Sequence, residues 1–371
     1  MRVVLAPDKF KGCLTAAEVA DALSAGLVRG RPGVETIKLP VADGGDGTVA
    51  AALTAGFTKI VVDAVGPTGE SMQAPYALDG KLAVVELAAV VGLDLLPEAR
   101  LDPLGSSTYG LGLVMADAVT RGADLIVLGL GGSASTDGGA GMVQALGARL
   151  LDPDGQEIGR GGRGLSRLAR IDLTGLAQLN PVKVVVASDV DNPLLGPNGA
   201  AAVFGPQKGA TPADIAALEQ GLVTWANAVR ATTGRDPADM PGAGAAGGTA
   251  YAAVALLGAE LTPGIELILD LIGFADRLAG ADLVITGEGS LDEQSLAGKA
   301  PVGVARAAAR AGVPVVAVAG RNQLSRERLA EAGIAAAYPL SDLEPDPARS
   351  IADAPRLLVE VGARIAEEWL S

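Results

Sequence analysis

The sequence predicts an α/β protein in which a doubly wound parallel sheet, built from both ends of the chain, is interrupted by a second α/β domain. Apolar strand segments alternate with helical segments near both ends of the 371-residue chain, which is typical of a parallel sheet. The middle instead contains strand segments joined by short turns. Hydrophobic residues make up 49% of the chain but aromatic residues only 3%, so Ala, Val, Leu and Ile must fill the core, as they do where helices cover a parallel sheet.

The N-terminal region predicts two strand–helix units in succession. We expect strands over 2–7 and 35–40, and helices over 14–30 and 49–57. Thr15 and Glu18 have the spacing of a capping box, which fixes the start of the first helix.

The C-terminal region repeats this alternation. We expect strands over 281–287, 313–320 and 334–340, helices over 300–312, 325–333 and 353–370, and a loop over 287–299. Because strand–helix–strand crossovers are right-handed and join parallel strands, the two ends of the chain should share one sheet. The predicted domains are therefore 1–60 together with 281–371, and 61–280.

The middle of the chain predicts antiparallel pairing followed by strand–helix alternation. Strands within 59–88 are joined by turns at 66–70 and 78–81. Further along we expect a helix over 108–123, a strand over 123–130, a helix over 139–151, a strand over 182–190, and a helix that follows Thr211 as N-cap, with Pro212 and Asp214 in its first turn. The uncharged, glycine-rich segment 241–251 is either a close-packing or ligand-approach segment or a flexible linker.

Composition excludes several classes of function. The net charge of −14 argues against nucleic acid or an anionic membrane as a partner. The absence of histidine removes Ser-His-Asp and Cys-His catalysis and His-ligated zinc, so any metal site must use oxygen ligands, which suits Mg²⁺. The single cysteine, Cys13, excludes an intramolecular disulfide and fits a reducing cytoplasm. The first apolar run is too short for a signal peptide, so we expect a cytoplasmic protein.

The segment LGLGGSASTDGGAGM, residues 128–142, is the most distinctive in the chain. It follows a predicted strand and runs into a predicted helix. Backbone N–H groups and the positive end of a helix can hold a phosphate there, and glycine lets the backbone approach closely. The candidate phosphate-binding residues are Gly131, Gly132, Ser133 and Asp137, and Asp137 is also a candidate Mg²⁺ ligand or helix cap.

Other polar loops follow predicted strands, at the edge where open parallel sheets bind ligands. They supply Asp8, Lys9 and Lys11 after the first strand, Asp43 and Asp46 after the second, and Glu288 and Lys299 within 287–299. Asp189 and Asp191 lie at the end of the strand 182–190, where two carboxylates can share a Mg²⁺ or divide metal binding and proton transfer. Lys208 precedes a helix N-terminus, where a cation opposes the helix dipole, so we expect an anion beside it.

These residue types together favour phosphoryl transfer, which needs positioning, Mg²⁺, cationic groups and often an Asp that accepts the hydroxyl proton. The chain contains no GxxxxGK[ST] motif and no GxGxxG after its first strand, so neither a Walker A site nor a dinucleotide fingerprint is predicted. A nucleotide-dependent oxidoreductase and a non-catalytic binding protein for a small anion remain alternative hypotheses at this stage, because each loop by itself is compatible with an ordinary polar turn.

The order of these motifs resembles that of the bacterial glycerate kinases that phosphorylate D-glycerate with ATP. The resemblance runs from APDKFKG through VADGGDGT, GLGGSASTDGGAGM, SDVDNPLLGP, FGPQKGA and PGAGAAGG to TGEGSLDEQSLAGKAP, and so covers essentially the whole chain. It implies a flavodoxin-like α/β domain with a second α/β domain inserted, and a site in the cleft between them. It also implies an ATP- and Mg²⁺-dependent kinase that forms 2- or 3-phosphoglycerate.

On this hypothesis the candidate residues take specific roles. Asp189 is the expected general base on the substrate hydroxyl, and Asp191 joins it in holding Mg²⁺. Lys9, with Lys11 and Lys208, neutralises the substrate carboxylate or the phosphates. The remaining candidates bind substrate or phosphate: Asp8, Asp43, Asp46, Gly131, Gly132, Ser133, Asp137, Glu288 and Lys299. The expected partners are ATP and D-glycerate, with no nucleic acid and no membrane, and a homodimer is left open.

Overall fold

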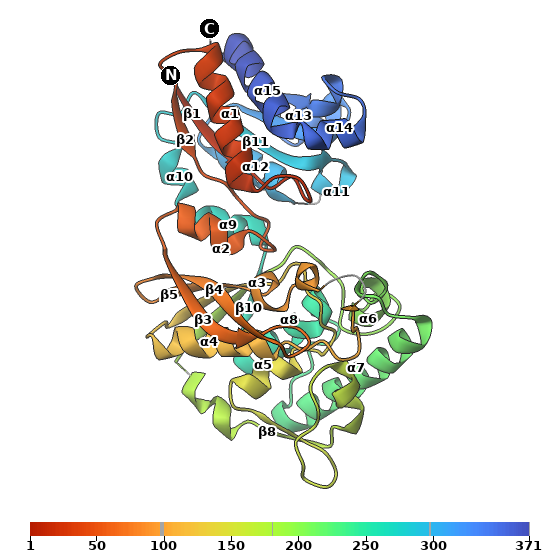
Figure 1. Cartoon of the computed structure of the whole chain (residues 1–371). Helices are drawn as coiled ribbons and strands as arrows, with labels where there is room; N and C mark the ends of the chain where they lie inside the picture. Colours follow the sequence, from red (N-terminus) through yellow and green to blue (C-terminus); the bar gives the residue numbers. More distant parts are fainter. Residues whose placement is uncertain (97–99, 180, 297, 371) are drawn as a thin grey trace. The chain divides into compact units, whose positions relative to one another are not determined.

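The computed structural model describes every residue except 97–99, 180, 297 and 371, and it groups the chain into two compact units (Figure 1). The terminal unit contains Met1–Asp43, Ala50–Ala55 and Ile265–Ser371. The central unit contains Gly44–Val49 and Gly56–Gly264. The domain limits inferred from the sequence, 1–60 with 281–371 and 61–280, stay a prediction.

The terminal unit is built on a five-stranded parallel sheet in the order β13-β12-β11-β1-β2. Its strands are β1 (Arg2–Pro7), β2 (Glu35–Lys38), β11 (Leu283–Leu291), β12 (Val315–Asn322) and β13 (Ala336–Pro339). Numbered within this unit, the order is 2-1-3-4-5, as in flavodoxin-like folds, so the predicted fold class is confirmed. In Figure 1 the red strand β1 belongs to the same sheet as β11, and both ends of the chain therefore contribute to it.

Helices cover both faces of this sheet. They are α1 (Ala16–Gly30), α9 (Gly264–Leu271), α10 (Phe274–Arg277), α11 (Glu293–Leu296), α12 (Ala300–Arg310), α13 (Arg326–Glu331), α14 (Pro347–Ala352) and α15 (Ala354–Trp369), with the 3₁₀ turn η6 (Leu340–Asp342). Val3 and Leu5 pack in the core with α1 and α15, whereas Val4 and Ala6 pack in the core with α9 and α12. This alternation along β1 is that of a strand buried on both faces. The predicted capping box starts α1.

The central unit contains a six-stranded sheet in the order β10-β9-β6-β5-β4-β3. Its strands are β3 (Thr58–Val65), β4 (Ser71–Asp79), β5 (Leu82–Glu86), β6 (Leu125–Gly129), β9 (Lys183–Ala187) and β10 (Glu260–Thr262), and β7 (Arg149–Leu151) pairs separately with β8 (Arg170–Asp172). β3, β4 and β5 are antiparallel, as the short turns predicted, and β5, β6, β9 and β10 are parallel.

The helices of the central unit pack around one large apolar core. They are α3 (Ala88–Val91), α4 (Tyr109–Thr120), α5 (Ala140–Ala145), α6 (Ala200–Phe204), α7 (Pro212–Thr233) and α8 (Ala245–Leu257), with the 3₁₀ turns η1 (Leu93–Leu95), η3 (Gly162–Arg167), η4 (Thr174–Leu179) and η5 (Pro206–Lys208). α2 (Thr48–Thr54) contributes residues to both units. Thr211 is the N-cap of α7, as predicted, and it forms a capping box with Asp214. No helix in the described part of the chain is long and apolar enough to cross a membrane.

The helix predicted over 139–151 is wrong in its second half. α5 ends at Ala145, and Arg149–Leu151 form the strand β7 instead. Gly147 has a φ of +106° and donates to the carbonyl of Gln144 at 3.1 Å, while Ala148 donates to Val143 at 2.9 Å. These two bonds form a Schellman-type helix end, which a glycine in the left-handed region permits.

One further segment differs from its prediction, and another decides between two alternatives. β11 runs on to Leu291, because its residues up to Leu291 pair with β12 as far as Asn322, so the loop expected from 287 begins later. The segment 241–251 is not a flexible linker: most of it is buried, and it leads into α8. A Cβ on Gly247 would lie 2.1 Å from the carbonyl oxygen of Ser135, so this segment packs closely against the distinctive glycine-rich loop.

Candidate active site

The carboxyl edge of the terminal sheet contains a topological switch point between β1 and β11. The chain leaves β1 toward β2 on one side and leaves β11 toward β12 on the other. Ligands of open α/β sheets bind in the crevice that such a reversal creates. Asp8 follows β1 there, with its backbone N–H donating to the carbonyl of Gly287 at 2.8 Å, and Glu288 lies in the adjacent strand.

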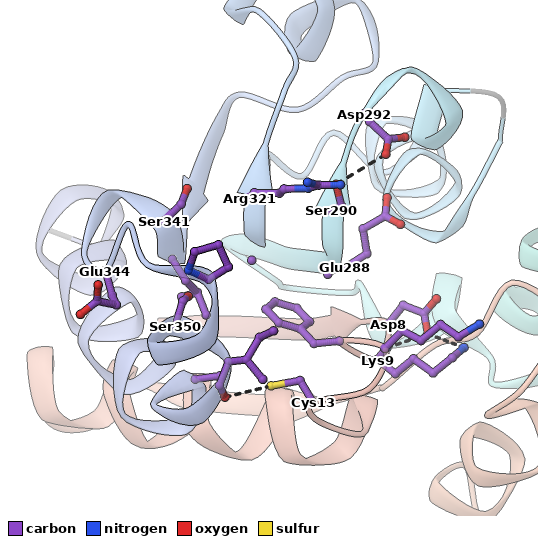
Figure 2. A pocket seen from close by; sticks show the side chains of 18 of the residues that line it. Asp8, Lys9, Cys13, Glu288, Ser290, Asp292, Arg321, Ser341, Glu344 and Ser350 are labelled. Carbon is purple, nitrogen blue, oxygen red and sulfur yellow. Dashed lines mark hydrogen bonds and ion pairs between the residues drawn. The ribbon is translucent and has the colours of Figure 1, made fainter. Parts of the chain in front are cut away.

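A cavity of about 570 Å³ opens at this switch point, entirely within the terminal unit (Figure 2). Its charged lining residues are Asp8, Lys9, Lys11, Asp43, Glu288, Asp292, Lys299, Arg321 and Glu344. Six of these were predicted as site residues from the sequence, on three separate segments. The structure therefore brings Asp8, Lys9, Lys11, Asp43, Glu288 and Lys299 together around one cavity.

Burial changes the acid–base properties of two carboxyl groups in this cavity. The pKa of Asp8 is raised from 3.8 to about 7, mainly by burial and further by Asp43 and Glu288, although Lys9 opposes the shift. Lys9 places its ammonium 3.7 Å from Asp8 Oδ1 and its backbone N–H 2.6 Å from the same oxygen. Asp8 is therefore a carboxyl group that can hold or release a proton near neutral pH.

Glu288 is the second perturbed carboxyl group. Burial raises its pKa, and Asp292 and Asp43 add to the shift, whereas Lys299 and a hydrogen bond from Ser295 oppose it. Its Oε1 is buried, and no described residue hydrogen-bonds to that oxygen. A buried polar atom without a partner is rare in proteins, and its presence beside a cavity is consistent with a ligand that supplies the missing partner.

The sequence analysis missed part of this cavity. Arg321 lines it and donates from Nε to Ser290 Oγ at 3.0 Å (Figure 2). Its signal was its position directly after the predicted strand 313–320. The segment 340–354 forms another wall. Its residues carry no recognisable motif, so no sequence signal identified them.

The remaining predicted residues belong to the central unit, where glycines bring several loops together at the carboxyl edge of the sheet. A Cβ on Gly131 would lie 2.4 Å from the Cα of Gly45, and one on Gly129 would lie 2.7 Å from the carbonyl oxygen of Gly44. Residues 44–46 of the predicted loop 42–48, which include Asp46, therefore lie directly against the start of the glycine-rich loop. Gly132 and Asp46 are exposed there.

Asp137 is fully buried at the end of the glycine-rich loop. Its carboxylate accepts hydrogen bonds from Thr108, at 2.8 Å from the backbone N–H and 2.9 Å from the hydroxyl, and from the backbone N–H groups of Gly139 and Gly141 at 3.2 Å. The carboxylate thus accepts from two N–H groups at the start of α5 and from Thr108 at the start of α4, and so connects the two helix ends. Its helix-capping geometry is clear, while its role toward a ligand remains a prediction.

Lys208 is also buried, with 2% of its surface exposed. Its ammonium donates to Ser133 Oγ at 2.8 Å and to the carbonyl of Ser135 at 2.5 Å. Burial lowers the pKa of Lys208 to about 7, although the charge of Asp137 opposes the shift. The lysine therefore acts as an internal brace for the glycine-rich loop.

Asp189 and Asp191 are both exposed beyond the end of β9. Asp189 Oδ1 accepts a hydrogen bond from the backbone N–H of Gly264 at 2.7 Å, which fixes this carboxylate beside the end of β10. Within the described residues, no group of three or more acidic, cysteine or histidine side chains surrounds a common metal position.

Glu86 is a buried acidic residue of the central unit that the sequence analysis did not select. Its Oε2 accepts a hydrogen bond from the backbone N–H of Val49 at 2.9 Å, near the start of α2. The signal was a single carboxylate at the end of an otherwise apolar strand.

Comparisons with known proteins agree over nearly the whole chain. A model of the glycerate kinase family matches residues 3–370. The glycerate kinase of Halalkalibacterium halodurans is 47% identical over 343 residues, covering 91% of this chain and 90% of that protein. Glycerate 2-kinase of Escherichia coli is 46% identical over 325 residues, covering 86% of this chain and 85% of that protein. A solved structure from Salmonella typhimurium LT2, assigned as glycerate kinase 2, has a TM-score of 0.85 and 41% identity, covering 99% of this chain and 97% of that one.

Proposed function

The chain belongs to the glycerate kinase family, and from this premise we propose that it transfers the terminal phosphoryl group of ATP to the 2-hydroxyl group of D-glycerate. The name of the Escherichia coli relative, glycerate 2-kinase, supports 2-phosphoglycerate as the product. The observation in this structure that supports phosphoryl transfer best is the switch-point cavity. It combines the carboxyl group of Asp8, whose pKa is raised to about 7, with several ammonium groups.

The proposed reaction needs a group that accepts the hydroxyl proton. The glycerate oxygen attacks the terminal phosphorus, the bond from that phosphorus to the bridging oxygen of ADP breaks, and the hydroxyl proton passes to a carboxylate. Asp8 meets the requirement that a general base have a pKa near the working pH. Asp189, proposed from the sequence, is the second candidate, and the two can be separated by mutation.

The cationic groups have a complementary role in this proposal. Lys9, Lys11 and Lys299 line the cavity and would neutralise the phosphates or the carboxylate of glycerate. Mg²⁺, when bound, would neutralise and orient phosphate oxygens, and we propose Asp189 and Asp191 as its protein ligands. A cytoplasmic location and a homodimer remain predictions.

One coupled assay tests the proposal. The protein is supplied with ATP, Mg²⁺ and D-glycerate, and the product is passed to enolase with and without phosphoglycerate mutase. Product consumed by enolase alone is 2-phosphoglycerate, as proposed, whereas product that requires the mutase is 3-phosphoglycerate. Absence of product in both arms would refute the proposal, and omission of Mg²⁺ tests the metal requirement.

A further inference from the structure

The switch-point cavity has a second, apolar end that phosphoryl transfer itself does not require. Its wall comes from the segment 340–354 and includes Leu340, Pro345, Pro347 and Ile351. In Figure 2 the labelled residues Ser341, Glu344 and Ser350 of this segment lie on the opposite side of the view from Asp8 and Lys9. One cavity therefore has an end dominated by charged side chains and an end, called the apolar end below, where apolar side chains lie beside Ser341, Glu344 and Ser350.

Ile351 shows that the apolar end lacks a cover. Its exposed fraction is 57%, the highest among the exposed large hydrophobic residues in the described part of the chain. Removing such an apolar side chain from water is favourable, so contact with a flat apolar ligand would stabilise a complex. The backbone carbonyl of Ile351 is held by the thiol of Cys13 at 3.3 Å, which fixes this wall to the loop after β1.

The volume and the two ends of the cavity indicate which substrate it can hold. About 570 Å³ lies within the range of roughly 300–1,000 Å³ found for pockets that enclose drug-sized ligands. D-Glycerate is a small acid with no apolar surface, and it would use only the charged end. A nucleotide has a flat base at one end and phosphates at the other. The base would match the apolar end of the cavity and the phosphates its charged end.

We propose that this cavity of the terminal unit binds the nucleotide, with the base against Leu340 and Ile351 and the phosphates toward Lys9 and Lys299. This inference rests on the proposed function, because it identifies where the phosphoryl donor of that reaction binds. It assigns the apolar side chains of the segment 340–354, which carries no motif, to recognition of the base. Glu344 and Ser350 are then the polar groups available to the ribose hydroxyls.

The first experiment uses the unaltered protein and its only cysteine. Cys13 lines the cavity and is partly exposed, so its modification by N-ethylmaleimide reports occupancy of the apolar end. Burial raises the pKa of the Cys13 thiol, so the reaction is followed at pH 8.5. We expect saturating ADP to slow modification about tenfold and D-glycerate alone to leave it nearly unchanged. Protection by D-glycerate and not by ADP would overturn the proposal.

The second experiment uses Ile351→Asp, which places a charge where the base would lie. We expect the dissociation constant of ADP, measured by calorimetry, and the KM for ATP to rise about tenfold, with the KM for D-glycerate nearly unchanged. Val28→Asp is the matched control, because Val28 is also exposed but does not line the cavity. An unchanged dissociation constant for ADP in Ile351→Asp would refute the assignment.

These measurements separate the two proposals. ADP binding needs no acceptor, so a protein that binds ADP with Cys13 protection but does not phosphorylate glycerate would refute the proposed function and leave the nucleotide site intact. A protein that phosphorylates glycerate while ADP leaves Cys13 modification unchanged would refute the nucleotide site and leave the proposed function intact. If Ile351→Asp does not fold, the protection experiment on the unaltered protein still decides.

Discussion

The carboxyl edges of the two sheets contain similar sequences but have different structures. In the terminal unit, Asp8, Glu288 and Lys299 line a cavity. In the central unit, Asp137 and Lys208 are almost completely buried and hydrogen-bond to the chain itself. Both edges combine strand ends, glycines and charged side chains, so the difference does not follow from residue types alone.

Glycine packing differs at several positions of the two edges. A Cβ on Gly289, beside the cavity, would meet its nearest neighbour at an ordinary 3.6 Å, and one on Gly12 would meet nothing within 4 Å. A Cβ on Gly131 or Gly247 in the central unit would approach the backbone to 2.4 Å and 2.1 Å. Gly12 and Gly289 therefore leave space beside the cavity, although a Cβ on Gly320, which also lines it, would lie 2.6 Å from the carbonyl oxygen of Gly289. A glycine-rich loop after a strand is not by itself evidence of an open anion site.

The largest expected effect tests the chemistry of the terminal edge. Asp8→Asn should lower kcat by about 10²–10⁴-fold, because the amide cannot accept the hydroxyl proton. Asp189→Asn is measured in parallel. Near-normal kcat in Asp8→Asn with a large loss in Asp189→Asn would assign the base to Asp189.

A stability measurement controls the Asp8 prediction. Its folded pKa of about 7 exceeds the ordinary value of 3.8, so between these values the folded protein holds a proton that the unfolded chain has released. Wild-type stability should therefore fall as pH rises through this range, and Asp8→Asn should lack that fall. Thermal unfolding at pH 8 should show a variant at least as stable as wild type, so that lost activity is not lost fold.

The next effect tests whether the central edge is a structural frame. Asp137→Asn should lower the free energy of unfolding by about 3 kcal/mol or more, because the amide leaves several buried donors without a charged acceptor. Urea unfolding measures this change. A variant of wild-type stability that has lost nucleotide or glycerate binding would instead support the ligand role predicted for Asp137.

A smaller loss of stability should follow from Gly131→Ala. The added Cβ would lie 2.4 Å from the Cα of Gly45, so the backbone must shift at a cost of about 1–3 kcal/mol. Gly159→Ala is the control, because a Cβ there meets nothing within 4 Å and no left-handed φ is involved. Equal melting temperatures for the two variants would contradict the close packing described for the central edge.

The last effect concerns Lys208 and appears as a pH dependence. Its folded pKa of about 7 lies below the ordinary value of 10.5, so between these values the unfolded chain binds a proton that the folded protein has released. Wild-type stability should rise with pH in this range by up to about 1.4 kcal/mol per pH unit. Unfolding curves of Lys208→Met should lack this rise. An identical slope in both proteins would show that Lys208 is charged when buried.

Features that depend on local sequence could be predicted. The capping boxes at Thr15 and Thr211 need only residues within one helical turn, and both are present. The alternation of strands and helices was sufficient to place both ends of the chain in one sheet. The early end of α5 was missed because Gly147 lies inside an otherwise helical pattern, and the pairing of β7 with β8 involves residues distant in sequence.

The part of the candidate site whose residues directly follow strands could be predicted from the sequence. The part formed by the segment 340–354 could not be predicted. Asp8 and Glu288 lie at strand ends, so a shared edge could be expected. The wall formed by 340–354 depends on how the C-terminal segments pack beside the loop after β1, which no spacing in the sequence encodes. The burial of Lys208 could not be predicted either, because nothing in the sequence around it shows that its ammonium lies inside the protein.

The position of β1 inside the terminal sheet has a consequence for synthesis of the chain. β1 pairs with β11, whose residues lie 280 positions later, as in the register of Val3 with Leu283. At ordinary translation rates β1 waits on the order of tens of seconds for this partner, while all strands of the central unit emerge earlier. An apolar strand that lacks one of its two neighbours is prone to aggregation, so chaperones should matter most in this interval. The sheet that contains β1 is therefore completed only after all strands of the central unit have been made.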